Sequence, residues 1–245
     1  MSNKIENYTY LLSPPARTVS AVLKLLKIPH EDIILDLSRG EQHKPENLAK
    51  NPSHKVPMIN EDGFCLTESR AICTYLLDKY RENNSQIAEQ LYPKNDLKAR
   101  AKINSALQKT FDLHDALAKG AVFQYALKVE PWATTISKSE EAVARIKSME
   151  PMFPMFQTQL ENCLKTANQP YVERDFSTEK MNLADLYVLD EAMTAIELNP
   201  KLLWENYAGL QKLLEESKQF STYEEHQGAW LEEGKEYAKK FAALE

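Results

Sequence analysis

Every segment of this chain with the pattern of a β-strand lies before residue 68. Four runs of β-branched, aromatic and aliphatic residues carry this pattern, at 5–12, 32–37, 56–59 and 64–66. After residue 82 the apolar residues recur at helical spacing instead. The sequence therefore predicts a small α/β domain at 1–82, a polar linker at 83–91 and an all-helical domain at 92–245.

The order of elements predicts how the first domain is connected. Residues 16–27 have helical spacing and lie between the first two strands, which predicts a right-handed crossover and a parallel strand pair. Asn60–Gly63 supplies turn residues between the two short strands, so these two form a hairpin. A helical pattern then runs from Glu68 towards Tyr80.

Two helices of this domain are expected to begin beside polar residues. Ser13 precedes Pro14 and Pro15, which fit the first turn of a helix. Glu68 and Ser69 precede the last helix of the domain, and the free N–H groups of a helix start favour a carboxylate. Taken alone, an ordinary turn and an ordinary helix cap explain these residues better than a binding site does.

The second half of the chain reads as a series of helices. Pro151 and Pro154 are expected to break the helical pattern of 132–167. A capping box is predicted at the start of the apolar helix 182–197, where Asn182 would accept from the third helical amide and Asp185 from the cap amide. Further helices are expected near 207–216 and 222–242.

Composition narrows the class of protein. The chain is 43% hydrophobic, enough for a core, yet no apolar run approaches the roughly 18 residues of a membrane helix. The N-terminus lacks a signal-peptide pattern, and three cysteines without a CxxC motif indicate reduced thiols and no metal site. The net charge of −6 argues against nucleic-acid binding. We therefore expect a cytoplasmic protein that binds neither membranes nor nucleic acids.

Four motifs, in this order and at these separations, resemble the cytosolic glutathione transferases: Ser13–Arg17, Asn51–Pro57, Glu68–Ile72 and Asn182–Asp185. The C-terminal stretch 223–229 is similar to the insect delta and epsilon classes. The Ser13 motif looks most like the epsilon class, with theta-like enzymes as neighbours. The resemblance covers nearly the whole chain and implies a thioredoxin-like N-terminal domain, a helical C-terminal domain and a homodimer.

The resemblance also implies roles for particular residues. Ser13 would donate a hydrogen bond to the glutathione sulfur and favour the thiolate, which is the nucleophile. A cis Val56–Pro57 peptide would present backbone groups to the cysteinyl part of glutathione. The implied glutathione-binding residues are His54, Lys55, Val56, Pro57, Glu68, Ser69 and Arg70, with Gln42 at a position where relatives often carry His or Lys and His43 beside it. In other classes a tyrosine ends the first strand, but here Leu11 holds that place and Tyr10 is expected to point away.

The second substrate would be a small apolar electrophile held between Ser13 and the first long helix of the second domain. The candidates are Phe111, His114, Leu117 and Phe123, with Trp230 or Phe241 as a cover. The expected activity is detoxification, in which glutathione is the co-substrate. Hydroperoxide reduction or dehydrohalogenation are open as side activities. Two alternatives remain open: a non-catalytic ligand-binding or structural relative, and a dedicated steroid or biosynthetic enzyme that uses glutathione.

Overall fold

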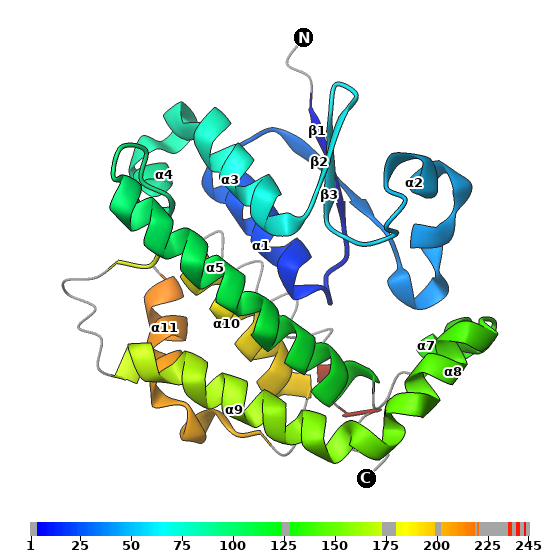
Figure 1. The fold of residues 1–245 in the computed structure, drawn as a ribbon. Helices are drawn as coiled ribbons and strands as arrows, with labels where there is room; N and C mark the ends of the chain where they lie inside the picture. The colour runs from blue at the N-terminus through cyan, green and yellow to red at the C-terminus, as the bar shows by residue number, and fades with distance from the viewer. Residues whose placement is uncertain are drawn as a thin grey trace.

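The computed structural model describes residues 4–123, 128–172, 180–198, 202–218, 220, 235–236, 239–240 and 243. Figure 1 shows a domain containing a small sheet beside a bundle of helices. In chain order the described elements are β1 (Ile5–Thr9), α1 (Pro14–Leu25), β2 (His30–Ile34), η1 (Leu37–Arg39), η2 (Glu41–His43), α2 (Pro45–Lys50), β3 (Met58–Glu61), β4 (Phe64–Thr67), α3 (Ser69–Lys79), η3 (Arg81–Asn84), α4 (Ser85–Leu91), α5 (Leu97–Leu117), η4 (Ala118–Val122), α7 (Trp132–Ser137), α8 (Glu140–Met149), η5 (Glu150–Met152), α9 (Phe153–Val172), α10 (Leu183–Leu198), η6 (Trp204–Asn206) and α11 (Ala208–Ser217).

The sheet has the strand order β2-β1-β3-β4. β1 pairs in parallel with β2 across the α1 crossover, and antiparallel with β3, which forms a hairpin with β4. α1 and α3 contact each other and bury their apolar residues with Ile5 and Ile59 of the sheet. The predicted strand–helix–strand unit, hairpin and thioredoxin-like fold are therefore confirmed.

The other face of the sheet carries a smaller apolar cluster. Tyr8, Leu35 and Met58 are buried there, and Val56 packs against them. The ammonium group of Lys50, at the end of α2, lies over the Tyr8 ring at 4.7 Å from its centroid. This face therefore anchors the segment between β2 and β3, which leads into the Val56–Pro57 peptide.

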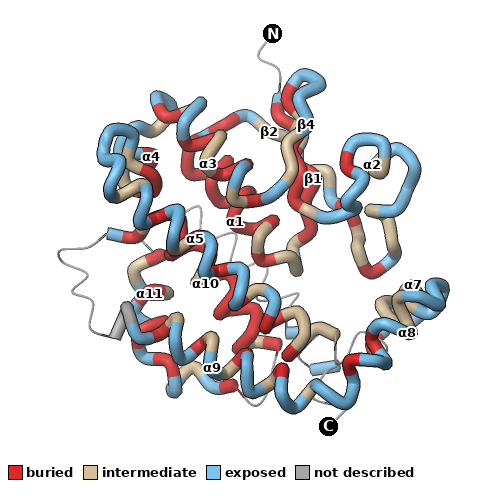
Figure 2. Tube along the Cα trace, in the orientation of Figure 1, coloured by how far each residue is buried: buried red, intermediate tan, exposed pale blue. Residues whose placement is uncertain are grey.

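α10 is the central helix of the second domain. Nearly all of its residues are buried, and it contacts α1, α5, α9 and α11 (Figure 2). A helix that is apolar all round belongs in a core. At its start Asp185 accepts from the Asn182 amide at 2.8 Å, as in a capping box. The Asn182 side chain accepts from the backbone amide of Ala184 at 2.9 Å, whereas the amide of the next residue was the expected donor.

A buried ion pair joins α1 to α10. The Nε atom of Arg17 lies 3.3 Å from Oδ1 of Asp190, and both side chains are fully buried. Arg17 also donates to the Thr194 hydroxyl at 2.7 Å and to the Leu11 carbonyl at 3.1 Å. Thr18 donates to the other carboxylate oxygen of Asp190 at 2.5 Å. The same guanidinium therefore holds the chain just before Ser13 and fixes it to the helical domain.

The segment expected as a linker, 83–91, is mostly helical. α4 occupies it, and Ala88 and Leu91 are buried because they pack into the main core. The division of the chain into domains at this segment stays a proposal. Nearly all of the helix expected at 222–242 lies outside the described residues. Within the described ranges, none of the helices combines the length and apolar character needed to cross a bilayer.

We predict that Arg17→Ala lowers the free energy of unfolding by about 3–5 kcal/mol, because it leaves the buried Asp190 carboxylate without its cationic partner. Urea denaturation followed by circular dichroism measures this change. Arg39→Ala is the matched control: Arg39 is exposed and pairs with Asp36 at 3.2 Å, so its loss costs at most about 1 kcal/mol. Equal losses in the two variants would contradict the role of the buried pair.

Candidate functional site

Three chain connections meet at one edge of the sheet, namely the edge formed by the ends of the strands. Tyr8 of β1 lies opposite Met58 of β3, and Met58 lies opposite Thr67 of β4. β1 ends one residue beyond this row, β4 ends in it, and β3 begins there. The Ser13 turn, the Val56–Pro57 peptide and the Glu68–Ser69 helix start therefore gather at the same edge.

Ser13 is the N-cap residue of α1. Its backbone is extended, with φ −90° and ψ 109°, and its carbonyl accepts from the amides of Ala16 and Arg17. Its hydroxyl makes no capping bond, and none of the described residues bonds to it. The side chain is half-buried. Ser13 thus holds a hydroxyl at a helix N-terminus, where the partial positive charge favours an anion.

Tyr10 is buried, and its ring meets that of Trp132 edge-on with the centroids 6.4 Å apart. Trp132 begins α7, and Thr135 of the same helix donates to the Ser38 carbonyl. α7 therefore reaches across from the helical domain to the turn that carries Ser13 and to η1. Sequence reasoning missed Trp132, because no pattern links it to Tyr10. The one sequence feature that could have pointed to Trp132 is its position directly after Pro131.

The Val56–Pro57 peptide bond is cis, as the resemblance implied. The preceding loop is organised by Asn51, which is buried. Its side chain donates to the Lys55 carbonyl at 2.7 Å and accepts from the Ser53 amide and hydroxyl at 3.1 and 2.6 Å. These bonds hold His54, which has a φ of 46° and an exposed side chain.

His43 lies beside His54, with ring centroids 4.6 Å apart. Burial and the nearby charge of His54 lower the pKa of His43. The Oε1 atom of Gln42 is buried and has no hydrogen-bond partner among the described residues. The structure therefore brings His43 next to His54.

Glu68 and Ser69 form the start of α3. Glu68 has a φ of 67°, is exposed, and caps the helix through its carbonyl, which accepts from the Ile72 amide at 2.9 Å. Ser69 is buried near the phenol of Tyr187, whose hydroxyl lies 3.4 Å from the Cys73 sulfur. Burial raises the pKa of Tyr187 well above its usual value, so the phenol stays neutral.

The resemblance implies Arg70 as a glutathione contact, and in the structure its side chain binds the helical domain. Its Nε atom donates to the Leu107 carbonyl and the Thr110 hydroxyl, each at 3.0 Å. Its guanidinium lies 3.7 Å from the ring centroid of Phe111 and 4.7 Å from that of Tyr187. An arginine between two aromatic faces gains cation–π attraction. Arg70 thus fastens α3 to α5 and α10.

The residues expected to contact the second substrate are spread over different environments. Phe111 is exposed beneath Arg70, Leu117 is buried in the main core, and Phe123 packs against Ile146, Met149 and Phe156. Leu117 therefore packs in the main core, and Phe123 lies partly buried against a second apolar cluster. Trp230 and Phe241 lie outside the described residues.

His114 has a different setting. Its Nδ1 atom lies 2.9 Å from Oε1 of Glu191, whose side chain is fully buried, whereas 42% of the His114 side chain is exposed. The charge of Glu191 raises the pKa of His114, and burial and the positive charges of Arg70 and Lys55 oppose it.

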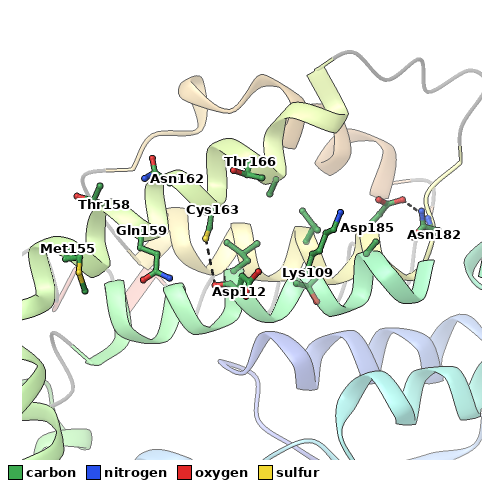
Figure 3. Close-up of a pocket in the computed structure, with 15 residues that line it drawn as sticks. Lys109, Asp112, Met155, Thr158, Gln159, Asn162, Cys163, Thr166, Asn182 and Asp185 are labelled. Carbon is green, nitrogen blue, oxygen red and sulfur yellow. Dashed lines mark hydrogen bonds between the residues drawn. The ribbon is translucent and has the colours of Figure 1, made fainter. Parts of the chain in front are cut away.

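A cavity of about 1170 Å³ lies elsewhere, between α5 and α9 and in front of α10 (Figure 3). Its walls include Lys109, Asp112, Met155, Asn162 and Cys163. Figure 3 shows it on the opposite side of α5 from α1 and α3. Neither Ser13 nor the other expected glutathione contacts line it.

We predict that Glu191→Gln lowers the pKa of His114, measured by NMR titration of the imidazole C–H signals. Because the folded-state pKa is raised, the pair stabilises the protein fully below the unfolded pKa of about 6.5 and loses this effect as pH rises through the folded pKa. The difference in unfolding free energy between wild type and Glu191→Gln should therefore be larger at pH 6 than at pH 9. A difference that grows towards pH 9 would contradict this pairing.

Residues 8–84 match the family model for the glutathione S-transferase N-terminal domain. A 118-residue stretch, 47% of this chain, is 37% identical to glutathione S-transferase D7 of Drosophila melanogaster, and the match spans about half of that relative's length.

Solved structures extend the likeness to the whole fold. A delta-class glutathione transferase of Nilaparvata lugens superposes with a TM-score of 0.72 at 24% identity, covering 98% of this chain and 100% of the other. Human glutathione transferase theta-2, solved with glutathione, gives 0.69 at 26% identity, covering 96% and 91%. A Drosophila mojavensis homologue with bound glutathione gives 0.72 at 20% identity, covering 97% of each chain. Residues 8–84 are thus similar to a glutathione S-transferase N-terminal domain, and the chain as a whole has the fold of the cytosolic glutathione transferases.

Proposed function

We propose that this protein is a glutathione transferase that binds glutathione at the sheet edge and conjugates it to small apolar electrophiles. The observation that carries the proposal is the meeting of three features at one edge: the unbonded Ser13 hydroxyl, the cis Val56–Pro57 peptide and the start of α3. Together they offer a hydroxyl donor, backbone groups and a helix N-terminus to one ligand.

The proposed role of Ser13 is to stabilise the thiolate of bound glutathione. A free thiol has a pKa of about 8.5, so most of it is protonated at neutral pH. A hydrogen bond from the Ser13 hydroxyl, with the positive end of α1 behind it, favours the charged sulfur. Ser13 acts as a donor to the nucleophile and forms no bond to carbon itself.

The rest of glutathione would follow the same edge. The Val56 backbone would pair with the cysteinyl part, as in strand addition. The start of α3 would bind the γ-glutamyl carboxylate through Ser69, and Glu68 would attract its ammonium group. His54, Lys55 and neighbouring His43 supply positive or polar groups for the glycyl carboxylate. Arg70 is assigned to holding α3 in place instead.

The proposal extends to the setting of the reaction. The N-terminal domain would hold glutathione and the helical domain would hold the electrophile, near His114 and Phe111. A homodimer working in the cytoplasm on toxic electrophiles fits the resemblance to insect and theta-class enzymes.

One observation favours a second function, that of a non-catalytic ligand-binding relative. The cavity between α5 and α9 is large enough for an organic ligand and is separate from Ser13. The two functions differ in whether bound glutathione ionises, which the next experiment measures.

We predict that Ser13→Ala raises the pKa of bound glutathione and lowers kcat about 100-fold, in line with loss of one preorganised donor to an anion. Ultraviolet difference spectra against pH follow the thiolate, and steady-state kinetics give kcat. Ser105→Ala, on the exposed face of α5, is the control and should change neither. If wild-type protein binds glutathione but shows no thiolate near neutral pH, this result contradicts the catalytic proposal and supports the ligand-binding alternative.

We predict that Ser69→Ala weakens glutathione binding about tenfold or more, because one hydrogen bond to the bound carboxylate is lost, while kcat changes little. Isothermal titration calorimetry measures the dissociation constant. Ser85→Ala, at the start of α4, is the matched control. An unchanged dissociation constant in Ser69→Ala would remove the α3 start from the glutathione site.

A further inference from the structure

The segment that carries His43 is buried at one point only. Of residues 37–50, only Ser38 is buried, with 2% of its surface exposed, and the others are exposed or half-buried. The Ser38 carbonyl accepts from the hydroxyl of Thr135, and α7 contacts η1 there. A helix of the second domain therefore covers the one buried point of this segment.

The contact at Ser38 continues to His43 through the backbone. Gly40 ends η1 and begins η2 with a φ of 76°, and its carbonyl accepts from the His43 amide at 3.0 Å. A Cβ atom at Gly40 would lie 3.4 Å from Cγ2 of Thr135, so the methyl group of Thr135 packs beside this corner. Thr135 thus holds η1 by its hydroxyl and the corner before His43 by its methyl group.

Trp132 lies one turn earlier on α7 and contacts the turn that carries Ser13. Its ring meets that of Tyr10 edge-on, at an angle of 67°. Aromatic rings favour this arrangement. Tyr10 is buried, and its carbonyl accepts from the Ser13 amide at 3.0 Å, which closes the turn. α7 therefore contacts two separate parts of the proposed glutathione site.

The position of α7 is set by the helical domain. Ile136, next to Thr135, packs against the buried side chains of Ile146 and Met149 on α8 and Phe156 on α9. α7 has only six residues, and a helix shorter than about 12 residues is marginal in water without such packing. The cluster around Ile136 consequently fixes the helix that Thr135 and Trp132 share.

We propose that Thr135 and Trp132 are positioning residues of the glutathione site. Thr135 holds the segment that presents His43 to the glycyl carboxylate, and Trp132 holds the turn that presents the Ser13 hydroxyl to the sulfur. The inference rests on the proposed function, which assigns His43 and Ser13 to glutathione. A binding segment that is already ordered loses less freedom when its ligand binds, and this strengthens binding.

The two contacts predict different effects on bound glutathione. Loss of the Thr135 hydroxyl loosens the His43 end, so binding weakens while the sulfur keeps its donor. Loss of the Trp132 ring loosens the turn of Ser13, so the pKa of the bound thiol rises. A residue that only stabilised the fold would not separate these two properties.

The first test uses Thr135→Val, which keeps the shape of the side chain and removes its hydroxyl. In the protein without glutathione, hydrogen–deuterium exchange of the amides in 37–44, followed by mass spectrometry, should become about fivefold faster. The dissociation constant of glutathione, measured by calorimetry, should rise about fivefold, and the pKa of the bound thiol should stay unchanged. Thr135→Ser retains the hydroxyl and should keep most of the wild-type affinity. Thr134→Val, on the exposed side of the same helix, is the matched control.

The second test uses Trp132→Leu. Ultraviolet difference spectra should show that the pKa of the bound glutathione thiol rises by about 0.5, because the Ser13 hydroxyl is held less firmly. Trp132→Phe keeps an aromatic edge against Tyr10 and should stay close to wild type. Trp204→Leu is the control, since Trp204 is a half-buried tryptophan on η6.

The outcomes separate this inference from the proposed function. Faster exchange and weaker binding in Thr135→Val, with a higher thiol pKa in Trp132→Leu, support the inference. An unchanged dissociation constant in Thr135→Val, or an unchanged thiol pKa in Trp132→Leu, overturns it while the transferase function stands. Equal losses in the two control variants would show an effect of stability alone and would also overturn it. If wild-type protein binds no glutathione, or binds it without a thiolate near neutral pH, the proposed function itself fails and the inference fails with it.

Discussion

The contact between Arg17 and Asp190 is the interaction on which the geometry of the site depends. It joins α1, the helix that begins at Ser13, to α10, the central helix of the other domain. The same guanidinium binds the Leu11 carbonyl, two residues before Ser13. Because both charges are fully buried, the pair tolerates little change in the spacing of the two helices. The position of the Ser13 hydroxyl is therefore set by the packing of one domain on the other.

A second contact does the same for the other side of the site. Arg70 lies between the rings of Phe111 and Tyr187 and donates to α5, so the start of α3 is tied to the helical domain. Ser69, next to it, is buried near the Tyr187 phenol. The two arginines thus tie the two ends of the proposed glutathione site to α10, and Arg70 also ties its end to α5.

The parts of the fold that follow local rules could be predicted from the sequence. The parallel pair, the hairpin at Asn60–Gly63 and the helix that starts with Pro14 each depend on the periodicity or turn chemistry of a short stretch. The break at Pro151 and Pro154 follows from their missing N–H groups, and η5 separates α8 from α9 there.

What could not be predicted depends on long-range contacts. The segment 83–91 reads as a polar linker, yet α4 forms because Ala88 and Leu91 find a core built by distant residues. Arg70 belongs to a motif that suggests ligand binding, and the motif gives no sign of its contacts with the rings of Phe111 and Tyr187. The contact of Tyr10 with Trp132 and that of His114 with Glu191 join segments far apart in the chain. A sequence pattern reports local periodicity, and it carries no record of such pairings.

The most direct test of the central claim is a crystal structure of the protein with glutathione. The account predicts that the glutathione sulfur lies within hydrogen-bonding distance of Ser13 Oγ, that the cysteinyl backbone pairs with Val56, and that the γ-glutamyl carboxylate lies at the start of α3. Glutathione bound with its sulfur away from Ser13, or seated in the cavity between α5 and α9, would contradict it.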